Sequence, residues 1–231
     1  MMFEKKAGNY TLIYSDLIEK IDGIVHGFGL RGITGPEYLD AIGVKDHFVF
    51  QTDQVHGSTV HYLMRSKESL IIKGDAFISD RPGIVCFVRT ADCVPILLAD
   101  RDACAVAAVH AGWRGSAGNI VGKTIAAMRD AFSVDPGNLV AAIGPSICGR
   151  CYEVGGEVID ALSSLRIGDS WCIDSSHADL KAANRLLLEA AGVPASSIDV
   201  SDRCTFCEDA FNSYRRDKNE EGRQHNFIMI A

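Results

Sequence analysis

Residues 84–98 read IVCFVRTADCVPILL, the most apolar stretch of the chain. β-branched and aromatic side chains fill its first part, 84–89, and a second apolar run covers 95–98, which is the pattern of two short strands. Arg89 and Asp92 interrupt the stretch, so it falls well short of the roughly 20 apolar residues of a membrane helix. We therefore interpret it as two strands joined by a polar turn, and we expect no membrane span.

Similar strand patterns occur on both sides of this stretch, at residues 10–14, 24–28, 47–51, 59–64, 76–79, 104–110, 139–143, 198–201 and 226–230. Amphipathic helical patterns come later, at residues 117–132, 155–165 and 178–191. Strands that cluster early and helices that follow later favour an α+β protein over a doubly wound parallel sheet. No linker rich in Gly, Ser or Pro divides the chain. We predict an α+β fold with a single domain, residues 1–231, in which helices flank a mixed β-sheet or a pair of sheets.

Composition narrows the class of protein. The chain has 231 residues, 47% of them hydrophobic, and its 30 acidic and 23 basic side chains give a formal charge of −7. This is too apolar for a disordered protein, and the negative charge makes nucleic acid and anionic membranes improbable partners. No apolar segment follows the charged N-terminal residues, so we expect a cytoplasmic protein whose eight cysteines are reduced.

Three segments each place a metal-type donor at the end of a predicted strand. The donors are His56 in QVHG (54–57), Cys93 in TADCVP (90–95) and His110 in VHAGWRG (109–115). Two imidazoles and one thiolate form a set suited to zinc, and a catalytic zinc keeps its fourth position for water or substrate. On spacing alone, a buried thiol and two turn histidines explain the same residues.

The glycine-rich segment GWRGSAG (112–118) follows His110 and leads into a predicted helix. Glycines permit close approach of the backbone, and the exposed N–H groups at a helix start favour an anion. Arg114 adds a cation that suits a bidentate phosphate contact. The segment lacks the Lys-Ser/Thr ending of a P-loop, so a nucleoside triphosphatase is not supported, and a plain strand-to-helix turn is the alternative interpretation.

At this point the sequence resembles the YfiH-like family, which is labelled multicopper polyphenol oxidoreductase or laccase and is also described as a family of zinc-dependent purine nucleoside enzymes. The motifs that carry the resemblance are QVHG (54–57), GDA (74–76), TADCVP (90–95), HAGWRG (110–115), GPSI (144–147), CYEV (151–154) and SYRRD (213–217). They extend over most of the chain, and the pair of TADCVP and HAGWRG is highly specific.

The resemblance implies a catalytic zinc held by His56, Cys93 and His110. It also implies phosphorolysis of adenosine, inosine, guanosine or methylthioadenosine, and deamination of adenosine, with a purine nucleoside and phosphate as partners. For the proton transfers we name Asp75 and Asp92, although a carboxylate beside a ligand equally often orients a ligating histidine. The residues that we expect to contact substrate are Arg31, Gln54, Gly112, Arg114 and Gly115.

One position departs from the family pattern. The family usually has an arginine followed by paired glycines, whereas Arg31 is followed by Gly32 and Ile33. This makes Arg31 the least secure of the expected substrate contacts.

Two other enzyme classes remain open. A laccase needs a cluster of several coppers with many histidines, whereas the seven histidines of this chain contain no His-x-His pair, so copper is less expected than zinc. A cysteine hydrolase would use Cys93 as nucleophile and His110 as base. A binding module without activity would leave the thiol, histidine and glycine pattern unexplained.

Several other residues are not part of this expected site. The pairs Cys148/Cys151 and Cys204/Cys207 have the C-x-x-C spacing of zinc ligands, but they lie much farther apart than the 15 to 20 residues of a zinc ribbon. We therefore favour buried or surface thiols over a second zinc. Further candidates to line a purine pocket are Tyr152, Phe206, Tyr214, Arg215 and Arg216.

Overall fold

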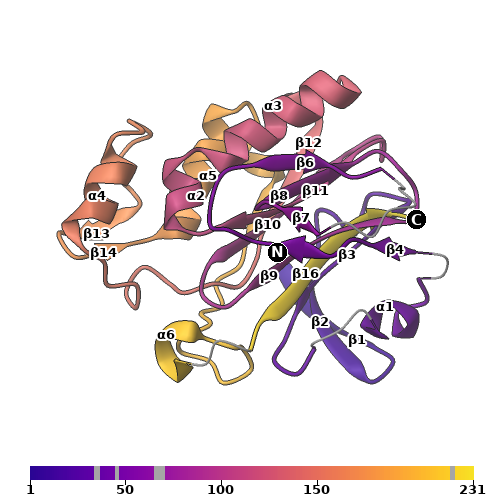
Figure 1. Ribbon diagram of the computed structural model, residues 1–231, viewed down its shortest axis with the longest axis horizontal. Helices are drawn as coiled ribbons and strands as arrows, with labels where there is room; N and C mark the ends of the chain where they lie inside the picture. Colours follow the sequence, from indigo (N-terminus) through magenta and orange to yellow (C-terminus); the bar gives the residue numbers. More distant parts are fainter. Residues whose placement is uncertain (34–36, 45–46, 65–70, 219–221) are drawn as a thin grey trace.

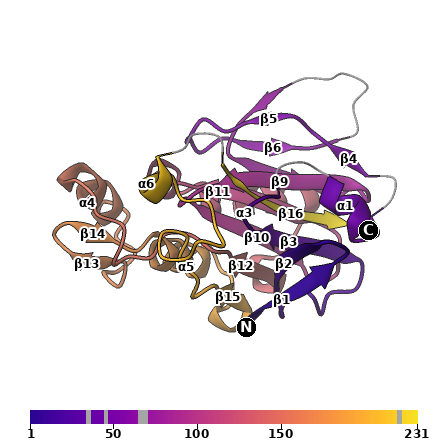
Figure 2. The ribbon, with the colours of Figure 1, turned by 90° about the horizontal axis from the view of Figure 1, so that it is seen from below.

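The computed structural model describes residues 1–33, 37–44, 47–64, 71–218 and 222–231, whose strands form two six-stranded sheets (Figure 1). The first sheet contains, in spatial order, β1 (Met2–Ala7), β2 (Tyr10–Ser15), β3 (Ile24–Gly29), β16 (Gln224–Ile230), β9 (Ile84–Thr90) and β4 (Phe48–Val49). The second contains β15 (Ile198–Val200), β12 (Leu139–Ile143), β10 (Val94–Asp100), β11 (Val106–Ala111), β8 (Ala76–Ser79) and β6 (Val60–Tyr62). Both sheets mix parallel and antiparallel pairs, and Figure 2 shows the first sheet from its β1 edge to β4.

Strand β10 explains why the central sequence is so apolar, because all seven of its residues are buried. Alternate side chains of a strand point to opposite faces. Ile96 and Leu98 pack in the cluster under the helices, whereas Leu97 and Ala99 pack in the cluster between the two sheets. The second sheet is therefore covered on both faces.

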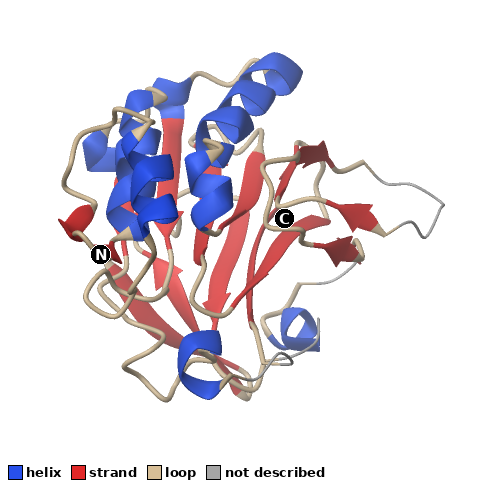
Figure 3. Cartoon of the chain, turned by 60° about the vertical axis from the view of Figure 1, so that its left-hand side comes forward, coloured by secondary structure: helices blue, strands red, loops and turns tan. Residues whose placement is uncertain are grey.

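The helices lie mainly over the outer face of the second sheet (Figure 3). They are α2 (Trp113–Ala117), α3 (Ile120–Phe132), α4 (Gly156–Ser163) and α5 (Leu180–Ala190). The Asn119 side chain accepts the N–H of Gly122 and so caps α3, and Asp179 caps α5 in the same way. On the other side of the molecule, α1 (Glu37–Ala41) covers the first sheet, while α4 and the hairpin of β13 (Cys172–Asp174) and β14 (His177–Ala178) project at one end (Figure 1).

The predicted α+β class, with a sheet pair and flanking helices, is confirmed. No helix in the described part of the chain is long and apolar enough to cross a membrane. The prediction missed several short elements, and one predicted helix has other bounds. Strand β1 is a charged edge strand without an apolar pattern, α1 is only five residues long, and the helix expected at 117–132 is two helices, with α2 beginning at Trp113 and the break at Asn119 in a left-handed conformation.

The chain passes from the first sheet to the second between β9 and β10, at residues 91–93. Two further segments end close to this crossing. They are the turn between β5 (Thr52–Asp53) and β6, which contains His56, and the end of β11, which contains His110. The crossing thus brings together the three donor segments identified in the sequence.

Candidate active site

The structure gathers His56, Cys93 and His110 into one cluster. One ligand atom from each residue lies within 4.8 Å of the others. The two imidazole rings are nearly perpendicular, at 88°, with centroids 4.8 Å apart. His110 is buried, Cys93 is half-buried and His56 is exposed, so the cluster is closed on the side of the sheet and open on the other. A mixed nitrogen and sulfur set with one open side fits a catalytic zinc, and that role for the three residues stays a prediction.

Asp75 lies behind the cluster and is fully buried. One carboxylate oxygen accepts hydrogen bonds from the His56 backbone N–H (2.9 Å) and lies 2.8 Å from His110 Nδ1, and the other accepts from the Gly57 N–H at 2.8 Å. With Nδ1 occupied in this way, His110 presents its Nε2 to the cluster. Burial alone would raise the pKa of Asp75, but the hydrogen bonds from His110 and Gly57 lower it. Asp75 is therefore a carboxylate that orients His110, and the expectation that it also moves protons stays a prediction.

The thiol and the buried imidazole change each other's ionisation. Burial would raise the pKa of Cys93, but the charge of His110 and hydrogen bonds from His110 and His56 bring it below the ordinary value. Burial would lower the pKa of His110, but Cys93 and Asp75 raise it above the ordinary value. The site thus favours a thiolate at Cys93, which is the form that binds a metal and also the form that acts as a nucleophile.

Two residues of the site have left-handed backbone conformations, His56 with φ 57° and Asp92 with φ 81°. Such conformations are uncommon outside glycine and persist where surrounding contacts hold them. Asp92 has those contacts: its carboxylate accepts from Thr205 Oγ1 and from the Arg215 backbone N–H, both at 2.7 Å. Asp92 also lines the pocket described next, so it remains a candidate for proton transfer.

The open side of the cluster faces a cavity of about 820 Å³. Its wall includes the three donors together with four arginines, namely Arg89, Arg114, Arg215 and Arg223. It also includes the aromatic residues Trp113, Tyr152 and Tyr214. The Arg114 guanidinium lies 4.3 Å from the Trp113 ring centroid, and that of Arg215 lies 5.4 Å from the Tyr152 ring centroid. A chain with a charge of −7 thus has a cavity rich in cations and in flat rings.

The structure places three of the five expected substrate contacts in the cavity lining and two outside it. Gln54, Gly112 and Arg114 line the cavity. Gln54 is also used internally, because its amide donates to the Arg89 carbonyl (2.8 Å) and accepts from the Arg89 N–H (2.7 Å). Gly115 is not part of the lining. A Cβ there would lie 2.9 Å from the Gly57 carbonyl, so this glycine lets α2 approach the His56 turn.

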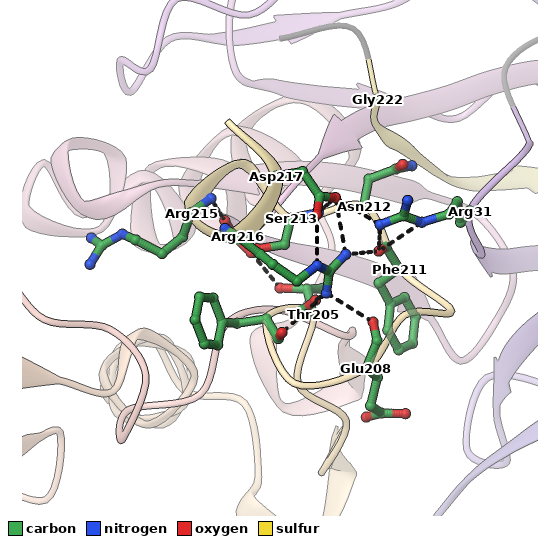
Figure 4. Close-up of polar contacts among 12 residues, drawn as sticks. Arg31, Thr205, Glu208, Phe211, Asn212, Ser213, Arg215, Arg216, Asp217 and Gly222 are labelled. Carbon is green, nitrogen blue, oxygen red and sulfur yellow. Dashed lines mark hydrogen bonds and ion pairs between the residues drawn. The ribbon is translucent and has the colours of Figure 1, made fainter. Parts of the chain in front are cut away.

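Arg31 is also outside the cavity lining. It donates to the Phe211 carbonyl and forms an ion pair with Asp217 at 2.7 Å (Figure 4). Arg216 lies beside it and donates to the carbonyls of Thr205 and Phe211. Both arginines therefore bind the segment around 205–217 internally, and a substrate role for Arg31 stays a prediction.

Some of the other residues that line the cavity were suggested by the sequence, and the rest were missed. Tyr152, Tyr214 and Arg215 line it, as suggested, while Phe206 and Arg216 do not. Arg89, Arg223 and Asp53 were missed, although an arginine inside the apolar run 84–98 was a usable signal for Arg89. The close approach of Gly112 to Cys93 was missed too. A Cβ at Gly112 would lie 3.2 Å from Cys93 Sγ, so the glycine leaves room beside the three donors.

Comparison with solved structures supports the fold over its whole length. The crystal structure of the hypothetical protein YfiH from Bacillus licheniformis superimposes with a TM-score of 0.88 and 27% sequence identity, covering 100% of this chain and 99% of that one.

Sequence comparison identifies the family. The family model described as multi-copper polyphenol oxidoreductase laccase matches residues 37–231. A protein of Deinococcus radiodurans named purine nucleoside phosphorylase is 39% identical over 79% of this chain and 70% of its own length. Adenosine deaminase RL5, from an unknown prokaryotic organism, is 45% identical over 62% of this chain and 56% of its own length. Two relatives of this chain are thus named purine nucleoside phosphorylase and adenosine deaminase, and the chain itself belongs to the multi-copper polyphenol oxidoreductase laccase family.

Proposed function

We propose that this protein is a zinc-dependent purine nucleoside enzyme that carries out phosphorolysis of adenosine, inosine, guanosine and methylthioadenosine and deaminates adenosine. The observation that carries the proposal is the His56, Cys93 and His110 cluster on the wall of a cavity that also presents arginines and aromatic rings. A purine needs a flat apolar surface, phosphate needs cations, and the bond to be broken lies between the two. The names of the related enzymes agree with this combination.

Zinc fits the donors better than the copper of the family description. The residues His56, Cys93 and His110 would hold one ion, with two nitrogens and one sulfur. A laccase requires a cluster of coppers held by many histidines, and this chain has seven in all. Among them, His26 is buried in the first sheet, where it accepts the Ser15 N–H, and it does not line the cavity. When bound, zinc supplies a Lewis acid that lowers the pKa of water toward neutrality.

The protein's own residues supply binding and orientation. Arg114 is exposed on the cavity wall with its guanidinium over the Trp113 ring, and no hydrogen bond or ion pair among the described residues occupies that guanidinium, so its donors are available to phosphate. Trp113, Tyr152 and Tyr214 offer rings for the purine. Asp75 keeps the His110 ring in place, and Asp92, which lines the cavity, is the residue that we assign to proton exchange with the purine or the ribose.

The alternative is a cysteine hydrolase, which the lowered pKa of Cys93 beside His110 also favours. The two functions differ in the role of Cys93, since a hydrolase uses it to attack carbon and a zinc enzyme uses it to hold the ion. His56 separates them structurally, because a second imidazole at the sulfur has a purpose in a metal site and none in a cysteine-histidine pair.

The test compares the wild-type protein with Cys93→Ala, both purified without added metal. We expect Cys93→Ala to contain about one zinc ion fewer per chain by mass spectrometry and to release no purine base from nucleoside in the presence of phosphate. Cys104→Ala, which changes an exposed cysteine outside the cluster, is the matched control and should behave as wild type. Equal zinc in all three proteins, with rapid alkylation of Cys93 by iodoacetamide, would show a cysteine hydrolase instead.

A further inference from the structure

The structure contains a second gathering of donors, formed by the two C-x-x-C pairs. The sulfur atoms of Cys148, Cys151, Cys204 and Cys207 all lie within 4.8 Å of one another. Sγ of Cys151 and Sγ of Cys207 are 3.4 Å apart, which is far longer than the roughly 2.05 Å of a disulfide. Four sulfurs at about 2.3 Å from a tetrahedral zinc would be separated by about 3.8 Å. The cluster thus has the dimensions of a tetrathiolate site.

Backbone hydrogen bonds form the framework of this cluster. Each pair closes a tight turn, since the Cys151 N–H donates to the Cys148 carbonyl at 2.9 Å and the Glu208 N–H donates to the Cys204 carbonyl at 3.1 Å. The turns are held together by a parallel bridge between Ser146 and Cys204. These contacts explain how two pairs separated by more than 50 residues meet, which the sequence spacing argued against.

The surroundings suit negatively charged sulfur. The Cys148 N–H donates to Sγ of Cys204 at 3.3 Å, the kind of contact that supports a metal-bound thiolate. The Arg216 guanidinium donates to the carbonyls of Thr205, Phe206 and Glu208 and so places a positive charge against the second turn. A zinc with four thiolates has a net charge of −2, and Arg216, which is itself paired with Asp217, offsets only part of it.

We propose that Cys148, Cys151, Cys204 and Cys207 bind a structural zinc ion through four thiolates. The donor set is complete with protein sulfur alone, which is typical of structural sites and leaves no position for water or substrate. None of the four cysteines lines the cavity of the His56, Cys93 and His110 cluster. This site is therefore separate from the proposed catalytic one, and it does not depend on the reaction that the protein catalyses.

The zinc ion would join two segments that shape the cavity. Ile147 and Tyr152, which flank the first cysteine pair, both line the cavity. Thr205, inside the second pair, donates to the Asp92 carboxylate. Joining the pairs therefore fixes one wall of the cavity to the crossing that carries Cys93.

The test counts zinc in five proteins, each passed over a chelating resin and analysed by mass spectrometry. We expect about two zinc ions per chain in the wild type, one in Cys207→Ser, one in Cys93→Ala and none in the double variant. Cys207 is exposed, so its replacement leaves the core intact, and Cys104→Ser serves as the exposed-cysteine control with two ions. Equal zinc in Cys207→Ser and wild type overturns the proposal. Loss of zinc from Cys93→Ala tests the catalytic site separately.

A second measurement does not depend on the folding of a cysteine variant in the second cluster. Cys93→Ala protein is stripped of metal and loaded with Co²⁺, so that the four-cysteine cluster is the remaining site. We expect a tetrahedral cobalt spectrum with thiolate-to-cobalt charge-transfer intensity equal to four sulfur ligands. A spectrum with the intensity of a single thiolate, the absence of cobalt binding, or recovery of the four cysteines as disulfides overturns the proposal.

Discussion

The two donor clusters of this protein are built in opposite ways. The His56, Cys93 and His110 cluster mixes nitrogen and sulfur, faces a cavity of about 820 Å³ and is supported by the buried carboxylate of Asp75. The four-cysteine cluster contains sulfur alone, lies outside that cavity and is supported by backbone turns. The difference teaches that access of substrate to the donors, more than the presence of donors, separates a catalytic site from a structural one.

The strongest test of this comparison replaces one cysteine in each cluster, because we expect one variant to lose activity and the other to lose stability. Cys93→Ala should lower kcat/KM for phosphorolysis by at least about 1000-fold, equivalent to several kcal/mol, while the midpoint of thermal unfolding changes little. Cys204→Ser should instead lower the unfolding midpoint strongly while the remaining folded protein keeps its zinc at the first cluster. Kinetics and calorimetry on both variants check this. A large loss of stability in Cys93→Ala with unchanged activity would reverse the assignment.

Asp75→Asn sharpens the comparison, because it tests the buried carboxylate that faces a donor side chain of the first cluster. The amide keeps the size of the side chain but removes the charge that faces His110. We expect a 10- to 100-fold loss of zinc affinity at the first cluster, and a similar loss of kcat/KM. Competition with a fluorescent chelator measures the affinity. Unaltered affinity would mean that Asp75 does not support the cluster.

Arg114→Ala tests whether the cavity beside the first cluster binds phosphate. Loss of a charged hydrogen bond of about 1.5 to 3 kcal/mol should raise KM for phosphate roughly 10- to 100-fold. Deamination of adenosine, which uses no phosphate, should change much less. Arg129→Ala, an exposed arginine of α3 paired with Asp130, is the control. An equal effect on both reactions would contradict the role of Arg114 in phosphate binding.

The last prediction concerns the stability contributed by a buried histidine that belongs to neither cluster. Burial lowers the pKa of His26 from 6.5 to about 3. Between these values the unfolded chain binds a proton that the folded protein does not, so the stability that the wild type has above pH 6.5 is lost as the pH falls. The loss at pH 5 should be about 2 kcal/mol. Urea unfolding at pH 7 and pH 5 measures it.

His26→Gln is the matched variant for that measurement. The glutamine amide can accept the Ser15 N–H in place of Nε2, and it does not titrate in this range. We expect the wild type to lose about 2 kcal/mol more than His26→Gln between pH 7 and pH 5. Equal losses would show that His26 is not responsible.

Local sequence patterns located most strands of the two six-stranded sheets and nominated the donors of the first cluster. The apolar strands around residues 84–98 were located because burial on both faces demands continuous apolar side chains, as β10 shows. His56, Cys93 and His110 were identified from donor chemistry and from the family resemblance. Strand β1 was not found, because it is an edge strand with charged residues whose place depends on pairing with β2.

Features that depend on contacts between residues far apart in the chain could not be predicted from local sequence patterns. The two cysteine pairs meet through the Ser146–Cys204 bridge, which no local periodicity reports. Arg31 was expected at the substrate, but its partner Asp217 is 186 residues away in the chain. The start of α2 at Trp113 was also missed, since its sequence has weak helix propensity and its packing decides the conformation.

The crossing at residues 91–93 also determines when, during synthesis, the active site comes into existence. Asp92 takes its left-handed conformation with hydrogen bonds from Thr205 and Arg215, which are 113 and 123 residues later in the chain. A nascent chain emerging from the ribosome therefore carries all three metal donors long before the anchors of this corner have been made. Translation must continue past residue 215 before these hydrogen bonds can hold the corner.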